Sequence, residues 1–125
     1  LTNLTFLWIQ DNEVVDISAL GSLTNLIELN LQKNQITDIS AISSMANLEI
    51  LNLTSNNISD LSPLTSLSNI TLLELSKNQI TDISPLLNSG LGEGATIRLW
   101  GEKLDANSVD VVIPQLKAAG VKVQF

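Results

Sequence analysis

Residues 1–88 consist of four copies of one 22-residue pattern, and this repetition constrains the fold more than any other feature of the chain. The copies cover residues 1–22, 23–44, 45–66 and 67–88. With few exceptions they share the pattern L-x-N-L-x-x-L-x-L-x-x-N-x-I-x-D-I-S-x-L-x-S. Repeats of this length bury their apolar residues by stacking on their neighbours, so the sequence predicts a solenoid with one continuous core.

Seven apolar positions recur in each repeat and predict one core layer per repeat. In the second repeat they are Leu23, Leu26, Leu29, Leu31, Ile36, Ile39 and Ile42. Within this set, Leu29-Asn30-Leu31 alternates apolar with polar residues, which is typical of a strand with one buried face. The 13 residues after each such strand are too few for a long helix. We therefore expect a return through a tight turn or 3₁₀ segment, which makes the strands parallel.

An asparagine follows each predicted strand at a constant position. We call this set the asparagine ladder, and its members are Asn12, Asn34, Asn56 and Asn78. An amide that turns inward can donate to, and accept from, backbone groups that the turn leaves unpaired. We expect these side chains to stack along the solenoid.

Composition narrows the classes of partner. The chain has 13 acidic and 6 basic residues, a net charge of −7, and no local cluster of Lys or Arg, so it would repel a phosphate backbone and we expect no nucleic-acid partner. No run of 18 consecutive apolar residues is present, which predicts no insertion into a membrane. Cysteine is absent, so the fold uses no disulfide and no thiolate metal ligand.

After residue 88 the repeat becomes irregular. The register slips by two residues, and the strand pattern returns as Ile97-Arg98-Leu99. Glu102 stands at the ladder position, where a carboxylate cannot donate to carbonyls, so we expect the ladder to end there. Residues 89–125 are predicted to form an irregular last repeat and a cap, continuous with the repeats of residues 1–88 in one domain.

The predicted cap consists of a helix and a strand. Between Ser108 and Ala119 the apolar residues fall at i, i+3, i+4 and i+7, which predicts an amphipathic helix. These residues are Val109, Val112, Ile113 and Leu116. Pro114 should kink or interrupt the helix, and Gly120 can end it. The alternating residues 121–125 then predict a final strand.

The motif L-x-x-L-x-L-x-x-N-x-I, present throughout residues 1–88, resembles the leucine-rich repeat family in its 22-residue class. The D-I-S-x-L turns at residues 16–20, 38–42, 60–64 and 82–86 resemble those of bacterial internalins and of the regulatory subunit of protein phosphatase 1. The helix and strand of residues 108–125 resemble C-terminal caps of bacterial members. The resemblance implies an α/β solenoid, a right-handed superhelix with a parallel concave sheet and 3₁₀ turns on its convex side, which binds proteins on the concave face.

The register names the residues of that face. One row comprises Phe6, Glu28, Ile50, Leu72 and Thr96. The row beside it comprises Trp8, Asn30, Asn52, Glu74 and Arg98, and a third comprises Gln10, Gln32, Thr54, Ser76 and Trp100. Our candidate partner-binding residues are Phe6, Trp8, Asn30, Ile50, Asn52, Leu72, Glu74, Arg98 and Trp100.

The apolar members of these rows have two interpretations. Phe6 and Trp8 point away from the core, where large apolar side chains indicate a partner, or else they pack on each other or on a segment that precedes them. Ile50 and Leu72 lie about 4.8 Å apart on neighbouring strands and form a second patch, although a β-branched Ile can also serve as a strand former.

A column of aspartates precedes the turns and consists of Asp16, Asp38, Asp60 and Asp82. Like charges at strand spacing repel by roughly 1 kcal/mol per neighbouring pair. Each carboxylate can accept backbone N–H bonds as an N-cap, which needs no metal, and the alternative is bound calcium. We favour capping and expect no metal and no cofactor.

Catalysis has little chemistry available. The chain has no His, Cys or Tyr, so the usual general bases and thiol nucleophiles are absent. The carboxylates are spread along an open surface that excludes no water. We therefore expect a binding protein and not an enzyme.

The first repeat lacks any cap before it, so we expect the natural protein to extend N-terminally or this end to be buried in a homodimer through residues 1–22. Three functions compete. We favour a recognition module, a fragment of a larger bacterial protein that is secreted or on the cell surface. The alternatives are an intracellular regulatory scaffold that holds a partner enzyme and a structural spacer that binds nothing.

Overall fold

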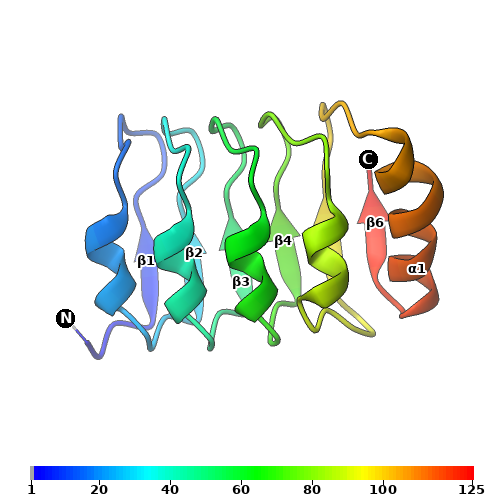
Figure 1. Cartoon of the computed structure of the whole chain (residues 1–125). Coiled ribbons are helices and arrows are strands. Elements are labelled where there is room, and N and C mark those ends of the chain that lie inside the picture. The colour runs from blue at the N-terminus through cyan, green and yellow to red at the C-terminus, as the bar shows by residue number, and fades with distance from the viewer. Residues whose placement is uncertain (1) are drawn as a thin grey trace.

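The computed structural model describes residues 2–125 and shows one six-stranded parallel sheet along the whole chain (Figure 1). The strands pair in the order of the sequence. They are β1 (Phe6–Trp8), β2 (Glu28–Asn30), β3 (Ile50–Asn52), β4 (Leu72–Glu74), β5 (Thr96–Arg98) and β6 (Lys122–Gln124). The predicted parallel solenoid is confirmed, and the final strand expected in residues 121–125 is β6.

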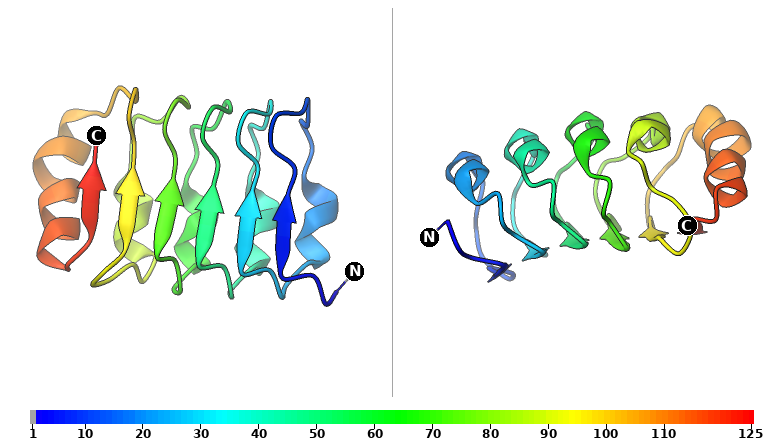
Figure 2. Two further views of the ribbon diagram at one scale, coloured as in Figure 1. Left: turned by 180° about the vertical axis from the view of Figure 1, so that it is seen from behind. Right: turned by 90° about the horizontal axis from the view of Figure 1, so that it is seen from below.

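Short 3₁₀ helices return the chain between successive strands, which is one of the two returns, a tight turn or a 3₁₀ segment, that the 13-residue spacing predicts. They are η1 (Ser18–Ser22), η2 (Ser40–Ser44), η3 (Ser62–Ser66) and η4 (Ser84–Asn88). Pro63 and Pro85 lie in the first turn of η3 and η4, where a missing N–H removes no helical hydrogen bond. In Figure 2 the strands line the inner side of a shallow arc and the helices line its outer side.

The core is a stack of layers, one for each repeat. All seven apolar positions of the second repeat are buried, and the same holds for the third, where Met45 replaces the first leucine. At the start of the solenoid Leu4, Leu7 and Ile9 pack against this core but remain partly exposed, because β1 is an edge strand. The core is therefore most completely closed in the middle of the chain.

The asparagine ladder connects these layers through hydrogen bonds in both directions. The Nδ2 of Asn56 donates to the carbonyl of Leu31 in the preceding repeat (3.0 Å) and to Leu53 in its own (3.1 Å), and its Oδ1 accepts the N–H of Ile36 (3.0 Å). Asn34 and Asn78 make the equivalent bonds. Asn12 is exposed and donates only within its own repeat.

Glu102 extends half of this arrangement into the cap. Its carboxylate accepts the N–H of Ile80 (2.7 Å), as the ladder amides do for the equivalent residue of the repeats before them. It also accepts the N–H of Asn78, a bond that the ladder amides do not make. The expectation that the ladder ends here therefore applies only to its donor half, because a carboxylate has no N–H to offer.

The cap helix departs from the sequence prediction in one respect. It begins at Ala106, passes through a π turn at η5 (Ser108–Val112) and continues as α1 (Ile113–Ala118). Pro114 has no N–H and clashes with the carbonyl four residues earlier, and the wider turn directly before it accommodates that clash. The predicted interruption is thus a π turn.

Because a π turn contains an extra residue, the helix face rotates between its two halves. The helical spacing grouped Val109 with Val112, Ile113 and Leu116 on one apolar face, but in the structure Val109 is 36% exposed and Ser108 is buried in its place. Ser108 accepts the N–H of Ile83 (3.0 Å) and donates to the carbonyl of Thr81 (3.3 Å), which joins the cap to the last 3₁₀ turn. Gly120 ends the helix at a φ of 89°, where a Cβ would lie 2.8 Å from the Cα of Glu93.

The aspartate column bonds to the start of each convex turn. In each repeat the Asp Oδ1 accepts the backbone N–H two residues later, at 2.8 to 2.9 Å. The Asp stands one position before the residue that forms the helix N-cap, so the N-cap prediction is wrong by one residue, although the expected backbone bond is present. Hydrogen bonds from the backbone and hydroxyl of Ser18 and Ser40 lower the pKa of Asp16 and Asp38, and those from Ser84 lower the pKa of Asp82. The bonds therefore outweigh the repulsion that Asp16 exerts on Asp38.

Removal of one ladder amide is expected to destabilise the solenoid. Asn56→Ala leaves two carbonyls and one N–H without hydrogen-bond partners inside the core, and the free energy of unfolding should fall by about 2 to 4 kcal/mol. Asn57→Ala is the matched control, because Asn57 is exposed, and should change it by less than about 0.5 kcal/mol. Chemical denaturation measures both, and equal losses would contradict the role given to the ladder.

Acid should remove the contribution of the aspartate caps. Because the folded pKa of Asp16, Asp38 and Asp82 lies below the unfolded value of about 3.9, their contribution is complete above that pH and is lost as the pH falls through the folded pKa. Thermal melts should show that replacing all three with Asn lowers Tm at pH 7 and reduces the further loss on acidification.

Two outcomes of these melts would contradict the capping assignment. A triple-Asn variant more stable than the wild type at pH 7 would show that repulsion dominates the column. A rise of Tm by several degrees on adding millimolar calcium to the wild type would indicate a bound ion, since a ligand of the native state stabilises it by mass action.

Candidate concave binding face

The concave side of the sheet carries two of the three predicted rows, as outward-pointing residues in the predicted register. The third row follows the strand ends, and its member Ser76 is buried. The first row runs Phe6, Glu28, Ile50, Leu72, Thr96 and Lys122. The second row runs Trp8, Asn30, Asn52, Glu74, Arg98 and Gln124. Since neighbouring strands lie about 4.8 Å apart, each row is a continuous track across all six strands.

The N-terminal end of the face is aromatic. Phe6 and Trp8 are 55% and 62% exposed and together line a surface hollow. The indole N–H of Trp8 donates to Glu28 Oε1 at 2.9 Å, so its polar group has a partner within the protein. The remaining exposed area of Trp8 is its ring, and exposed rings of this size are characteristic of interaction surfaces.

The middle of the face combines two aliphatic residues with amides. Ile50 and Leu72 are aligned on β3 and β4, and both are half-buried. Beside them the Nδ2 of Asn52 donates to Gln32 Oε1 (3.3 Å), while the Oδ1 atoms of Asn30 and Asn52 accept the backbone N–H groups of Gln32 and Thr54. These bonds hold the amide side chains in fixed orientations beside the aliphatic pair.

At the C-terminal end, Arg98 is held from three sides. It forms an ion pair with Glu74, and its Nε donates to Gln124 Oε1 at 2.9 Å. Its guanidinium lies 5.7 Å from the centre of the Trp100 ring, within the range of a cation–π contact. Trp100 itself is 52% exposed, so this network presents a second aromatic surface.

The sequence prediction missed the contribution of the cap strand to this face. Lys122 and Gln124 of β6 extend the two rows by one strand, and the alternating pattern of residues 121–125 contained that signal. It also missed the Trp8–Glu28 bond, because residues 20 positions apart become neighbours only through the register.

Charge is balanced on the two rows although the chain is strongly acidic. Only Glu28, Glu74, Arg98 and Lys122 are charged there, two of each sign, so the net charge of −7 lies elsewhere. The long-range field of the protein therefore arises from other surfaces, and the face can contact a partner without a net charge of its own.

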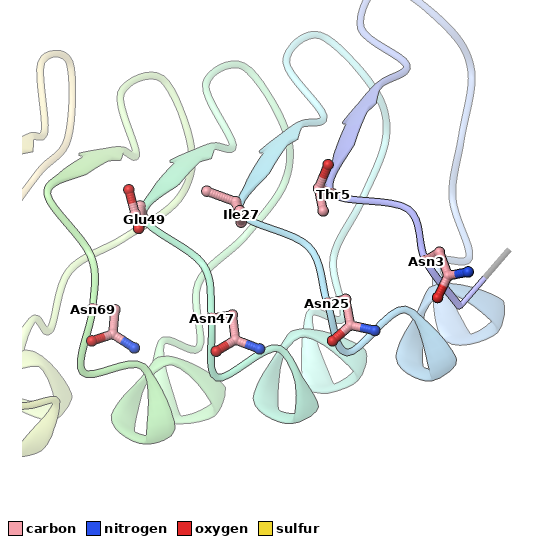
Figure 3. Close-up of a pocket in the computed structure, with 7 residues that line it drawn as sticks. All are labelled: Asn3, Thr5, Asn25, Ile27, Asn47, Glu49 and Asn69. Atoms are coloured by element: carbon pink, nitrogen blue, oxygen red, sulfur yellow. The ribbon is translucent and has the colours of Figure 1, made fainter.

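A second asparagine column lies at the opposite ends of the strands (Figure 3). The Nδ2 groups of Asn25, Asn47 and Asn69 donate to the carbonyls of Thr2, Thr24 and Ala46 at 2.6 to 3.1 Å. They line a groove with Thr5, Ile27 and Glu49. Since the Nδ2 groups of these asparagines already bond to the neighbouring turns, we interpret the groove as a structural contact between turns and not as a binding site. The sequence indicated this column through the Asn at the third position of the repeat pattern, but the sequence analysis did not interpret it.

Comparison with known proteins supports the repeat architecture. A family model described as Leucine Rich repeats (2 copies) matches residues 2–44 and again residues 46–88. No curated protein sequence matches the chain. Within residues 2–125 no helix has the length and apolar character that crossing a bilayer requires.

Solved structures show the same fold. An internalin (inlF) of Listeria monocytogenes is 38% identical, with a TM-score of 0.77 over 86% of this chain and 32% of its own. Internalin C2 of the same species is 29% identical, with a TM-score of 0.81 over 98% of this chain and 52% of its own. An Arabidopsis thaliana receptor-kinase ectodomain, GASSHO1/SCHENGEN3, in complex with CASPARIAN STRIP INTEGRITY FACTOR 2, is 24% identical, with a TM-score of 0.75 over 98% of this chain and 15% of its own.

The chain thus spans between about a third and a half of the length of these two internalins. The family model covers most of the four repeats, and the fold places their defining leucines in the core and their asparagines at the strand ends. This chain belongs to the leucine-rich repeat family and resembles the internalins within it.

Proposed function

We propose that the chain is a protein-binding recognition module that uses its concave face. The observation that carries this proposal is the exposure of Phe6, Trp8 and Trp100 on the same face as the aliphatic pair Ile50 and Leu72. Tryptophan and arginine dominate the energy of protein interfaces, and the bonds to Glu28, Glu74 and Gln124 orient these side chains before a partner arrives.

The candidate partner-binding residues are those of the sequence analysis, extended by the cap strand. They are Phe6, Trp8, Asn30, Ile50, Asn52, Leu72, Glu74, Arg98 and Trp100, together with Glu28, Lys122 and Gln124. The absence of His, Cys and Tyr from the sequence supports a binding role without catalysis.

The setting proposed for this module is the cell surface or exterior of a bacterium, within a larger protein. Support comes from the likeness to two listerial internalins, of which the chain covers only part. The alternative is an intracellular scaffold that holds a partner enzyme. A homodimer through residues 1–22 remains a further prediction, and the partial exposure of Leu4 and Leu7 in that repeat favours it.

Selection of a random peptide library on the immobilised chain tests the proposed face. Leu72→Lys places a charge in the middle of the concave surface and should weaken selected binders at least tenfold, which corresponds to about 1.4 kcal/mol. Leu87→Lys is the matched control, because Leu87 lies on η4 of the convex side and is already 39% exposed. Binders lost in the control and retained in Leu72→Lys would place recognition on another surface.

A further inference from the structure

The first row of the concave face has an ordered pattern of charge that the protein-binding role does not by itself require. From β2 to β6 it reads acidic Glu28, aliphatic Ile50 and Leu72, hydroxylic Thr96 and basic Lys122. The other two charges of the face, Glu74 and Arg98, lie in the second row and neutralise each other. Between β2 and β6 the first row therefore carries a negative and a positive charge on either side of an apolar centre, and Phe6 on β1 lies beyond the negative charge.

Both of these charges, on Glu28 and Lys122, are available to a partner. Among residues 2–125 the ion pairs are Lys33 with Asp11 and Arg98 with Glu74, so neither Glu28 nor Lys122 takes part in one. Lys122 is exposed, and Glu28 is half-buried with Oε1 occupied by the neutral indole of Trp8. A neutral donor does not cancel the carboxylate charge, so this site still favours a cation.

The separation of the two charges sets the length of the complementary segment. Four strand intervals of about 4.8 Å place Glu28 and Lys122 about 19 Å apart, which exceeds the screening length of about 8 Å at physiological ionic strength. Each end consequently acts on its own counter-charge. An extended segment rises about 3.3 Å per residue and covers the interval with about six residues.

We propose that the concave face binds an extended protein segment with a basic residue at one end, apolar residues in the middle and an acidic residue about six positions away. The basic residue lies over Glu28, the apolar residues contact Ile50 and Leu72, and the acidic residue lies over Lys122. The two charges fix the direction in which the segment crosses the strands. This inference rests on the proposed concave-face binding and adds the chemistry of the partner to it.

A charge exchange within the chain tests the proposal, with peptides from a random library as the probe. The double variant Glu28→Lys with Lys122→Glu reverses the row and leaves the net charge unchanged. Peptides selected on the wild type should bind it at least tenfold more weakly, and their sequences should show the base–apolar–acid order. Versions of these peptides with acid and base exchanged should recover affinity for the double variant.

The salt bridge between Asp11 and Lys33 provides the matched control. Both residues are exposed, the Lys33 Nζ lies 3.0 Å from the Asp11 Oδ1, and both have a positive φ. Asp11→Lys with Lys33→Asp therefore exchanges the same two charge types outside the two rows. It should leave peptide affinity unchanged. Glu28→Gln separates charge from the indole bond, because its amide oxygen still accepts from Trp8, and it should weaken binding about threefold or more.

Three results would overturn the proposal. Peptides that lose affinity for the Leu72→Lys variant but bind the charge-exchanged protein as well as the wild type would show that the concave face does not discriminate the order of charges in its partner. A selection without any peptide sensitive to Leu72→Lys would overturn the proposed face itself, and with it this inference. A doubling of mass in light scattering that the exchange abolishes would assign the row to a second copy of the chain.

Discussion

The whole structure depends on backbone groups that no single repeat can pair by itself. Each 22-residue turn of the solenoid leaves carbonyls and N–H groups at the bend after its strand, and burying them unpaired would cost about 1 to 3 kcal/mol each. Asn34, Asn56 and Asn78 satisfy these groups in their own repeat and in the preceding one. One amide per layer thereby fixes both the bend and the stacking of neighbouring layers.

The residues that build the fold are separate from those of the proposed binding face. Leucine and isoleucine columns fill the core, asparagines join the turns, and aspartates accept the first backbone N–H of the convex helices. The outward-facing strand positions fill no core layer and make none of these bonds between turns, so their residues can differ from repeat to repeat without loss of the fold. Phe6, Glu28, Ile50 and Leu72 occupy one such column and have four different side chains.

Periodicity explains how much of the structure could be predicted from the sequence. A strict 22-residue repeat fixes which residues align, so the core columns and the register of the rows followed from counting. Counting left the return open between a tight turn and a 3₁₀ segment, and the concave side of the sheet was implied by the family resemblance. The candidate site was predictable to the extent that it consists of register positions. Its bonds were not, because whether Glu28 reaches Trp8 or Gln124 reaches Arg98 depends on side-chain rotamers.

Prediction failed where the repeat stops. Val109 fits a helical spacing of 3.6 residues, but the π turn before Pro114 changes that spacing locally and buries Ser108 in its place. Glu102 breaks the asparagine pattern by residue type, yet its carboxylate serves the acceptor half of the same function. In both cases a residue outside the pattern accepts a hydrogen bond from a backbone N–H of the last regular repeat, Ile83 for Ser108 and Ile80 for Glu102.

Hydrogen exchange at the ladder tests the central claim most directly, since the N–H groups of Ile36 and Ile58 donate to the side chains of Asn56 and Asn78 and not to backbone carbonyls. If the ladder joins the layers, these two amides should exchange only through global unfolding, as slowly as the amide of Leu53, which donates to the carbonyl of Glu74 beside the strands. Exchange of Ile36 and Ile58 that is orders of magnitude faster, with Leu53 still protected, would contradict the account.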